Sequence, residues 1–226
     1  MRRLSIIVPT LDEAAGIGAS LAALQPLRAA GHEVIVVDGG SGDGTPARAR
    51  AHADRVLAAP RGRASQMNAG AAAAAGDVLV FLHADTRLPR DADRLVLDGL
   101  AAANAGWGRF DVRIEGRHPL LRTVAWLMNG RSRLTGIATG DQAMFATRAA
   151  FAAVGGFPPL ALMEDVELSR RLKRLSPPAC LRARAVTSGR RWESRGVVRT
   201  IVLMWWLRLR YFLGASPERL RRIYHG

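Results

Sequence analysis

The amino-acid sequence predicts an α/β protein built on a mostly parallel sheet that is flanked by helices. In the first half of the chain, short runs rich in Val and Ile alternate with Ala-rich helical segments, and residues 78–82 are apolar throughout. A strand that is apolar on both sides fits a sheet covered on both faces, and strands that alternate with helices run parallel. The second half alternates less regularly, so we expect a mixed region there, followed by C-terminal helices.

The expected elements follow the chain in order. In the first half, each apolar run predicts a strand, and each Ala-rich stretch that precedes a glycine or a loop predicts a helix. The expected strands lie at 4–8, 33–38, 55–58 and 78–82, with helices at 14–30, 45–53 and 63–75. In the second half we expect a half-exposed strand at 107–115, an amphipathic helix at 120–129, a strand at 140–145 and a helix at 162–175. Two basic helical stretches that carry tryptophan close the chain.

The length of 226 residues fits one ordinary domain, which we place at 1–195, with a basic, Trp-bearing helical extension at 196–226. The single cysteine, Cys180, excludes an intrachain disulfide framework and a cysteine-based zinc cluster, which suits a cytoplasmic protein. The opening MRRLSIIVPT predicts a first strand, because its apolar run is too short for a signal peptide. Arginines interrupt the apolar stretch 197–213, so we expect no membrane span there.

The formal charge of +14 predicts attraction to phosphates. Almost all of the positive charge is arginine in a chain rich in Ala and Gly, a composition that coding bias alone can produce. We therefore expect no nucleic-acid partner.

Acidic and small polar residues follow three of the expected parallel strands, at 9–13, 38–45 and 83–85. Helix caps account for part of this pattern, since Asp43 or Thr45 fits the cap of the next helix. The carboxyl ends of parallel strands meet at one edge of a sheet, where ligands bind in such folds. The glycine-rich segment 38–45 lacks the dinucleotide-binding order of glycines after the first strand, and no phosphate-binding loop ending in Gly-Lys-Ser/Thr occurs. These absences disfavour a Rossmann oxidoreductase and a P-loop ATPase.

Four segments together resemble the family 2 glycosyltransferases, inverting enzymes of the GT-A fold that use nucleotide sugars. They are SIIVPTLDEA at 5–14, VIVVDGGSGDGT at 34–45, GRASQMNAGAAAAAGDVLVFLHAD at 62–85 and GGFPPLALMEDVELSRRL at 155–172. The FLHADT, GDQ and LMED variants are most similar to a bacterial subgroup associated with arsenosugar biosynthesis. The resemblance implies a Rossmann-like nucleotide-binding sheet, a mixed acceptor-side half, and metal-dependent transfer from a UDP-linked sugar.

The resemblance also implies a metal site at the end of the fourth strand. Asp85 corresponds to the last acid of the family's Asp-x-Asp motif, which holds Mn²⁺ or Mg²⁺ against the donor diphosphate. His83 stands where the family has the first acid, and its imidazole fits either a metal ligand or a hydrogen-bond partner of the ribose. A structural role at the strand end is the alternative.

The remaining nucleotide-binding positions lie in the loops after the first two strands and at the start of the third helix. They are Pro9, Thr10, Glu13, Asp38, Arg63 and Asn68. By resemblance, Asp38 accepts a hydrogen bond from uracil, and Arg63 faces the nucleotide. Simpler interpretations are a turn residue for Asp38, an acid in a first helical turn for Glu13, and a solvated arginine for Arg63.

Glu164 and Asp165 are the expected catalytic pair. Direct displacement needs a carboxylate that takes the proton of the acceptor hydroxyl, and the family places this base at Asp165. The alternative is an acidic helix N-terminus without a catalytic role. We expect the sugar or acceptor to contact a further set: Gly140, Asp141, Gln142, Arg190, Arg191 and Trp192. For the last three, a plain basic turn is the alternative to a segment that covers the diphosphate.

The acceptor is open at this point, either a small molecule or a lipid. A polyprenyl phosphate acceptor would explain the basic C-terminal end that carries Trp205 and Trp206. This tryptophan pair fits core packing, a homodimer or a helix on an anionic membrane surface. Two further hypotheses are nucleotidyl transfer to a sugar phosphate and a non-enzymatic basic binding module.

Overall fold

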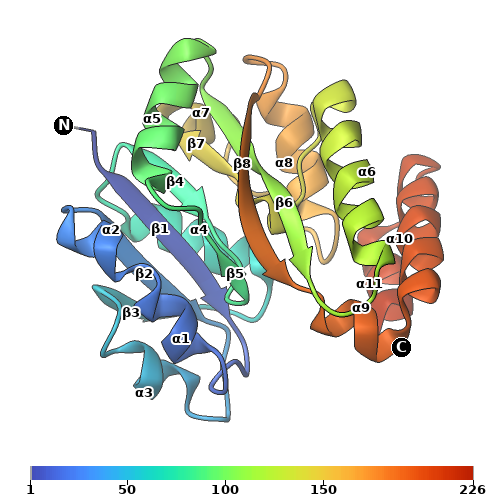
Figure 1. Ribbon diagram of the computed structural model, residues 1–226, viewed down its shortest axis with the longest axis horizontal. Coiled ribbons are helices and arrows are strands. Elements are labelled where there is room, and N and C mark those ends of the chain that lie inside the picture. The colour runs from blue at the N-terminus through green and yellow to red at the C-terminus, as the bar shows by residue number, and fades with distance from the viewer. Residues whose placement is uncertain (1, 226) are drawn as a thin grey trace.

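The computed structural model describes residues 2–225 as a three-layer α/β/α structure (Figure 1). One sheet forms the middle layer. Its strands are β1 (Leu4–Thr10), β2 (Glu33–Asp38), β3 (Arg55–Ala58), β4 (Val78–Phe81), β5 (Thr86–Arg87), β6 (Trp107–Glu115), β7 (Phe145–Thr147) and β8 (Ala179–Ser188).

The strands lie in the order β3-β2-β1-β4-β7-β6-β8-β5. β1 pairs in parallel with both β2 and β4, and β2 pairs in parallel with β3. β7 is antiparallel to both β4 and β6, while β8 is parallel to β6 and antiparallel to β5. The carboxyl ends of β1, β2, β3, β4, β6 and β8 therefore lie along one edge, which confirms the predicted mostly parallel sheet with a mixed second half.

The helices cover both faces of this sheet. They are α1 (Ile17–Ala22), α2 (Gln25–Ala29), α3 (Thr45–Ala49), α4 (Arg63–Ala73), α5 (Ala92–Ala102), α6 (Leu120–Thr135), α7 (Arg148–Ala153), α8 (Glu164–Leu172), α9 (Arg190–Arg195), α10 (Val197–Phe212) and α11 (Pro217–His225), with the short 3₁₀ helix η1 at Gly140–Gln142. On one face α1, α3 and α5 pack on the sheet, and on the other α4, α7 and α8 do so.

Several expected elements differ from those observed. The predicted helix 14–30 is two short helices, since Pro26 lies in the first turn of α2 and cannot continue the hydrogen bonding of α1. The predicted strand at 140–145 begins only at Phe145, after the 3₁₀ turn η1. The predicted half-exposed strand 107–115 is buried over its first six residues, because β6 lies between β7 and β8 and both of its faces are covered.

Helix α6 is held in place by polar contacts to β6. The side-chain amide of Asn129 exchanges two hydrogen bonds with the backbone of Val112, at 2.8 and 3.0 Å. Arg109, fully buried, donates to the Ser132 hydroxyl at 3.0 Å and pairs with Asp111. Arg133 reaches Asp111 from the helix at 2.9 Å. These contacts fix which face of α6 turns away from β6.

The C-terminal helices pack on the rest of the molecule at the start of α8. Leu207 of α10 and Leu220 and Tyr224 of α11 form one buried cluster with Leu162, Met163 and Val166. The predicted boundary between 195 and 196 stays a prediction, and Gly196, with φ 83°, separates α9 from α10 there. Trp205 and Trp206 are 61% and 41% exposed, so the expected core packing of this pair is wrong for the single chain. Within residues 2–225, the helices are too short or too polar to cross a membrane.

Candidate active site

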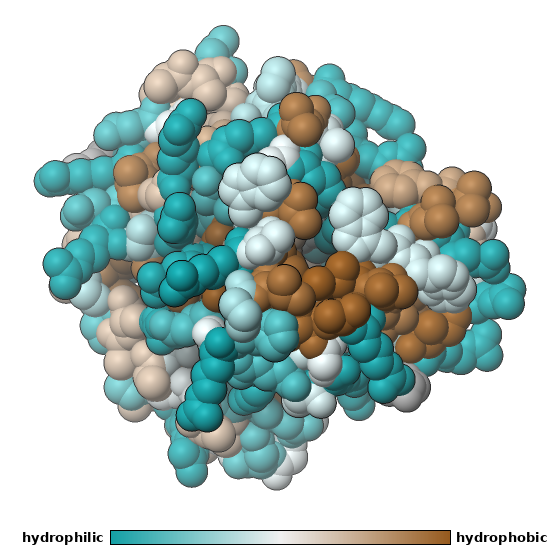
Figure 2. Space-filling view, turned by 45° about the vertical axis from the view of Figure 1, so that its right-hand side comes forward, coloured by the Kyte–Doolittle hydropathy of each residue, from teal (hydrophilic) through white to brown (hydrophobic). Residues whose placement is uncertain are grey.

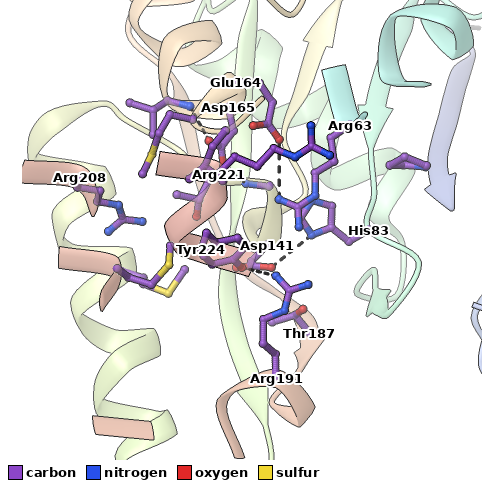
Figure 3. Close-up of a pocket in the computed structure, with 18 of the residues that line it drawn as sticks. Arg63, His83, Asp141, Glu164, Asp165, Thr187, Arg191, Arg208, Arg221 and Tyr224 are labelled. Atoms are coloured by element: carbon purple, nitrogen blue, oxygen red, sulfur yellow. Dashed lines mark hydrogen bonds and ion pairs between the residues drawn. The ribbon is translucent and has the colours of Figure 1, made fainter. Parts of the chain in front are cut away.

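A cavity of about 1200 Å³ opens at the carboxyl edge of the sheet (Figure 3). Its walls come from the ends of β1, β4 and β8, the N-termini of α4 and α8, and the faces of α6, α9, α10 and α11. The predicted site residues that line it are Pro9, Thr10, Glu13, Arg63, Asn68, His83, Asp85, Gly140, Asp141, Glu164, Asp165, Arg191 and Trp192. The structure thus brings most of the predicted set to one place, although their individual roles stay predictions.

Glu164 and Asp165 enter the cavity from the first turn of α8. The preceding residue, Met163, is buried and has a φ of 68°, a left-handed conformation that costs energy in a residue with a side chain. Both carboxylate oxygens of Asp165 accept backbone hydrogen bonds, one from Gly140 at 2.9 Å and one from Val166 at 2.7 Å. Asp165 is therefore held in one orientation by the turn η1 and by its own helix.

Glu164 is almost fully buried, with 4% of the residue exposed. Burial and the neighbouring charge of Asp165 raise the pKa of its carboxyl, while the positive charge of Arg63 acts in the opposite direction. Arg63 Nη1 lies 3.8 Å from Glu164 Oε1, too far for a strong pair. A carboxyl with a raised pKa beside one held by backbone N–H groups is an arrangement typical of acid–base sites.

His83 is engaged with the turn that supports Asp165. Its Nδ1 lies 3.3 Å from Asp141 Oδ1, and its Nε2 lies so close to Gly140 that a Cβ there would approach it to 2.3 Å. Burial opposes ionisation of Asp141, but the contact with His83 and nearby positive charges outweigh it and lower the pKa of the carboxyl. Both ring nitrogens therefore face the Gly140–Asp141 segment, which favours a positioning role for His83 over that of a metal ligand.

Asp85 fits a divalent cation that substrate phosphates complete. Its residue is exposed at the mouth of the cavity, and its nearest side-chain partner is the Thr86 hydroxyl, at 3.5 Å. Among the side chains that the structure describes, no three His, Cys, Asp or Glu lie close enough together to hold a metal by themselves. Mg²⁺ is usually bound through one or two carboxylates and the phosphates of a substrate, so a single accessible carboxylate suits it.

Asp38 lies beside the cavity without lining it. Its oxygens accept hydrogen bonds from the backbone of Gly40 and Ser41, at 2.9 and 2.8 Å, and from the hydroxyls of Ser41 and Thr10. Burial raises the pKa of Asp38, but these hydrogen bonds prevail and lower it. The carboxylate thus stabilises the turn after β2, as the simpler interpretation expected, and its contact with a base stays a prediction.

The side chains of three more predicted residues make contacts with other parts of the protein. Gln142 is fully buried and accepts from the backbone of Thr139, at 3.2 Å, so it lies behind the cavity wall. Asn68 lines the cavity but exchanges two hydrogen bonds with the backbone of Phe157. Arg190 lies outside the cavity and reaches Glu13 at 3.5 Å.

Several cavity residues were not predicted. They come from α6, β8, α10 and α11 and include Arg131, Thr187, Met204, Arg208, Arg221 and Tyr224. A signal was present for α10, since Ile201, Met204 and Arg208 recur at helical spacing and so share one face. In the sequence, Arg208 stands out only as an interruption of an apolar stretch.

Comparison with known proteins identifies the family. The model of the glycosyl transferase family 2 matches residues 5–152. Among curated proteins, no sequence matches the chain significantly.

Solved structures share the fold at low identity. TarS 1–349 from S. aureus, in complex with UDP-GlcNAc, is 17% identical with a TM-score of 0.65, over 82% of this chain and 58% of that solved chain. The mannosyltransferase PcManGT from Pyrobaculum calidifontis, in complex with GDP-Man and Mn²⁺, is 22% identical with a TM-score of 0.67, over 99% and 68%. Glucosyl-3-phosphoglycerate synthase from Mycobacterium tuberculosis, with Mn²⁺, UDP and phosphoglyceric acid, is 21% identical with a TM-score of 0.59, over 81% and 68%. The chain thus spans 58 to 68% of the length of these solved chains.

The raised pKa of Glu164 makes stability depend on pH. The folded protein binds the carboxyl proton of Glu164 more tightly than the unfolded chain does, where the pKa has its ordinary value of 4.5. The protonated carboxyl therefore contributes to folding stability below pH 4.5, and this contribution is lost as the pH rises through the raised pKa of the folded state. Urea unfolding between about pH 5 and 8 should show a smaller fall in unfolding free energy for Glu164→Gln than for the wild type. Arg63→Gln, which removes an opposing charge, should steepen the fall. Parallel curves for the wild type and Glu164→Gln would contradict the assignment.

Proposed function

The chain belongs to glycosyl transferase family 2, and we propose that it moves a sugar from a UDP-linked donor to an acceptor hydroxyl with inversion at the anomeric carbon. The observation that carries the proposal is the acidic pair Glu164–Asp165 in the same cavity as Asp85 and the carboxyl ends of β1 and β4. Family membership replaces the hypothesis of a non-enzymatic binding module. It also leaves nucleotidyl transfer without support.

Asp165 would act as the base. Its carboxylate takes the proton of the acceptor hydroxyl while the acceptor oxygen bonds to the anomeric carbon and the bond from that carbon to the diphosphate breaks. The backbone N–H groups of Gly140 and Val166 hold the carboxylate in place, so it need not reorganise during the reaction. No covalent sugar–enzyme intermediate forms.

The donor would lie across the ends of β1 and β4. Asp85 would hold Mn²⁺ or Mg²⁺, which when bound acts as a Lewis acid on the departing diphosphate. Arg63 and Arg191 line the same cavity, where guanidinium groups can bind phosphate oxygens. The complexes of TarS with UDP-GlcNAc and of the glucosyl-3-phosphoglycerate synthase with UDP support a UDP-linked donor. The complex of PcManGT with GDP-Man makes a GDP-linked donor the alternative. The arsenosugar subgroup rests on the sequence variants alone.

A membrane-surface enzyme with a polyprenyl phosphate acceptor is the second candidate, and the exposed faces of α6 and α10 favour it. Figure 2 shows apolar side chains gathered on the face that these helices form, bordered by hydrophilic ones. Large apolar residues of this face that are more than a third exposed include Trp126, Leu127, Leu134, Val202, Trp205, Leu209 and Phe212. A helix with aromatic and arginine residues of this kind suits the interface of an anionic bilayer. A homodimer through the same face is the competing occupant.

Removal of the base tests the transferase. Asp165→Asn keeps the size of the side chain and loses proton acceptance, so release of nucleoside diphosphate in the presence of acceptor extracts should fall about 10²–10⁴-fold. Nucleotide binding should persist, because Asp165 is placed on the acceptor side. Glu167→Gln, in the same first turn of α8 but outside the cavity lining, is the matched control and should retain activity. Activity of Asp165→Asn close to wild type would overturn the assignment of the base.

Vesicle co-sedimentation tests the membrane contact. Val202 and Leu209 are 62% and 57% exposed, lie seven residues apart on α10, and are outside the cavity lining. Replacing both with Asp should reduce binding to phosphatidylglycerol vesicles at least tenfold, since burial of each side chain is worth about 1.5–3 kcal/mol. Leu175→Asp, at an exposed leucine after α8, should bind like the wild type. Absence of vesicle binding by the wild type would exclude the membrane-surface version.

A further inference from the structure

Two arginines on neighbouring helices carry polar atoms that nothing in the described chain satisfies. Arg131 of α6 and Arg208 of α10 both line the cavity. The Nε and one terminal nitrogen of Arg131 and the Nε of Arg208 are buried and have no hydrogen-bond partner among the described residues. A buried donor without a partner costs free energy, and a charged one costs more. Such atoms need an explanation, and a bound anion supplies one.

The positive charge of Arg208 also acts on Arg131. Burial, and then the charge of Arg208, lower the pKa of Arg131 to about 10. The pKa of Arg208 is likewise lowered by burial, against the pull of Asp165 and Asp141. Asp165, whose charge acts on both arginines, already accepts hydrogen bonds from Gly140 and Val166. Asp165 and Asp141 thus offset the positive charge of the pair only in part, since burial still lowers the pKa of both arginines.

Arg208 lies away from the donor side of the cavity. In Figure 3, Arg208 lies on the opposite side of Glu164 and Asp165 from Arg63 and His83, which stand by the ends of the parallel strands. An anion at Arg208 would therefore face Asp165 from the acceptor side.

Packing and hydrogen bonds of the two helices fix the faces on which Arg131 and Arg208 lie. Asn129 and Ser132, which flank Arg131 on α6, are both hydrogen-bonded to β6. On α10, Leu207 is fully buried against the start of α8, which fixes the rotation of the neighbouring Arg208. Met204 and Trp205 line the cavity one turn before Arg208, so the anion site has apolar walls.

We propose that Arg131 and Arg208 form an anion subsite that binds a phosphate ester group of the acceptor next to Asp165. Two guanidinium groups can grip one phosphate through several charge-assisted hydrogen bonds, and the phosphate would neutralise their mutual repulsion. The subsite binds and positions the acceptor and takes no part in making or breaking bonds. The apolar walls accept a lipid phosphate, and a soluble phosphate ester carries the same recognised group. The inference rests on the proposed function, because it identifies the acceptor of that same cavity.

Calorimetry with paired probes tests the subsite. Farnesyl phosphate and glycerol 3-phosphate supply the phosphate, and farnesol and glycerol are the matched neutral probes. At least one phosphate probe should bind the wild type more tightly than its neutral counterpart. Arg131→Gln and Arg208→Gln should each weaken that binding roughly ten- to a hundredfold. Arg199→Gln, at an exposed arginine of α10 outside the cavity lining, should bind like the wild type.

A purely structural role for the arginines predicts a different result. Loss of an unpartnered buried charge should not lower the melting temperature of Arg131→Gln without ligand, whereas loss of a structural contact would. Phosphate probes that bind no better than the neutral ones, or that bind both variants like the wild type, would overturn the subsite. Preference for farnesyl phosphate would identify a lipid source, and equal binding of the two phosphates a soluble one.

Titration of the same proteins with UDP and GDP in the presence of Mn²⁺ separates this inference from the proposed function. Nucleotide binding retained by Arg131→Gln and Arg208→Gln supports an acceptor subsite. Loss of nucleotide and phosphate binding together would place the arginines at the donor and overturn it. Arginine-dependent phosphate binding without any nucleotide binding would instead sink the proposed function and leave the anion site.

Discussion

The placement of two adjacent carboxyl groups at the start of α8, with Glu164 buried and Asp165 half-buried, is the constraint on which the rest of the site depends. Two ionised carboxylates so close together are unfavourable away from water, unless nearby hydrogen-bond donors or positive charges stabilise them. Asp165 obtains two backbone N–H groups, and one of them belongs to Gly140 in the turn η1. That turn is itself contacted by His83 at the end of β4. The order of the central strands and the orientation of the acidic pair are therefore linked through a short chain of contacts.

Glu164 obtains less compensation than Asp165. Arg63 is 3.8 Å away, and the raised pKa of Glu164 shows that burial and the charge of Asp165 prevail. The left-handed Met163 and the packing of α10 and α11 on it maintain this unfavourable arrangement. A left-handed backbone at Met163 and a buried carboxyl at Glu164 are both unfavourable for folding. Unfavourable features that cluster at one site indicate a function for that site. The C-terminal helices thus complete the cavity, and they supply Arg208, one of the two arginines with buried donors that have no partner in the described part of the chain.

Much of this arrangement could be predicted from the sequence, because the informative residues follow regular elements. The apolar runs of β1, β2 and β4 are strong strand signals, and the acids after them meet at one edge by the geometry of parallel sheets. The second half was harder to predict. β5 and β7 have two and three residues, too few for a periodic pattern, and β8 carries arginines that hide its alternation. The polar side chains of Gln142 and Asp38 accept hydrogen bonds from the backbone of their own turns. A sequence does not distinguish a polar side chain that is hydrogen-bonded within the fold from one that is free to bind a ligand. The pairing of Arg131 with Arg208 depends on how α6 and α10 cross, which no local pattern records.

The central claim is that this cavity binds a nucleoside diphosphate through a metal held by Asp85. Calorimetric titration of UDP and GDP, with and without Mn²⁺, against the wild type and Asp85→Ala tests it most directly. We expect tight binding of one nucleotide that requires Mn²⁺ and is lost in Asp85→Ala. Absence of binding by the folded wild type, or equal binding by Asp85→Ala, would contradict the account.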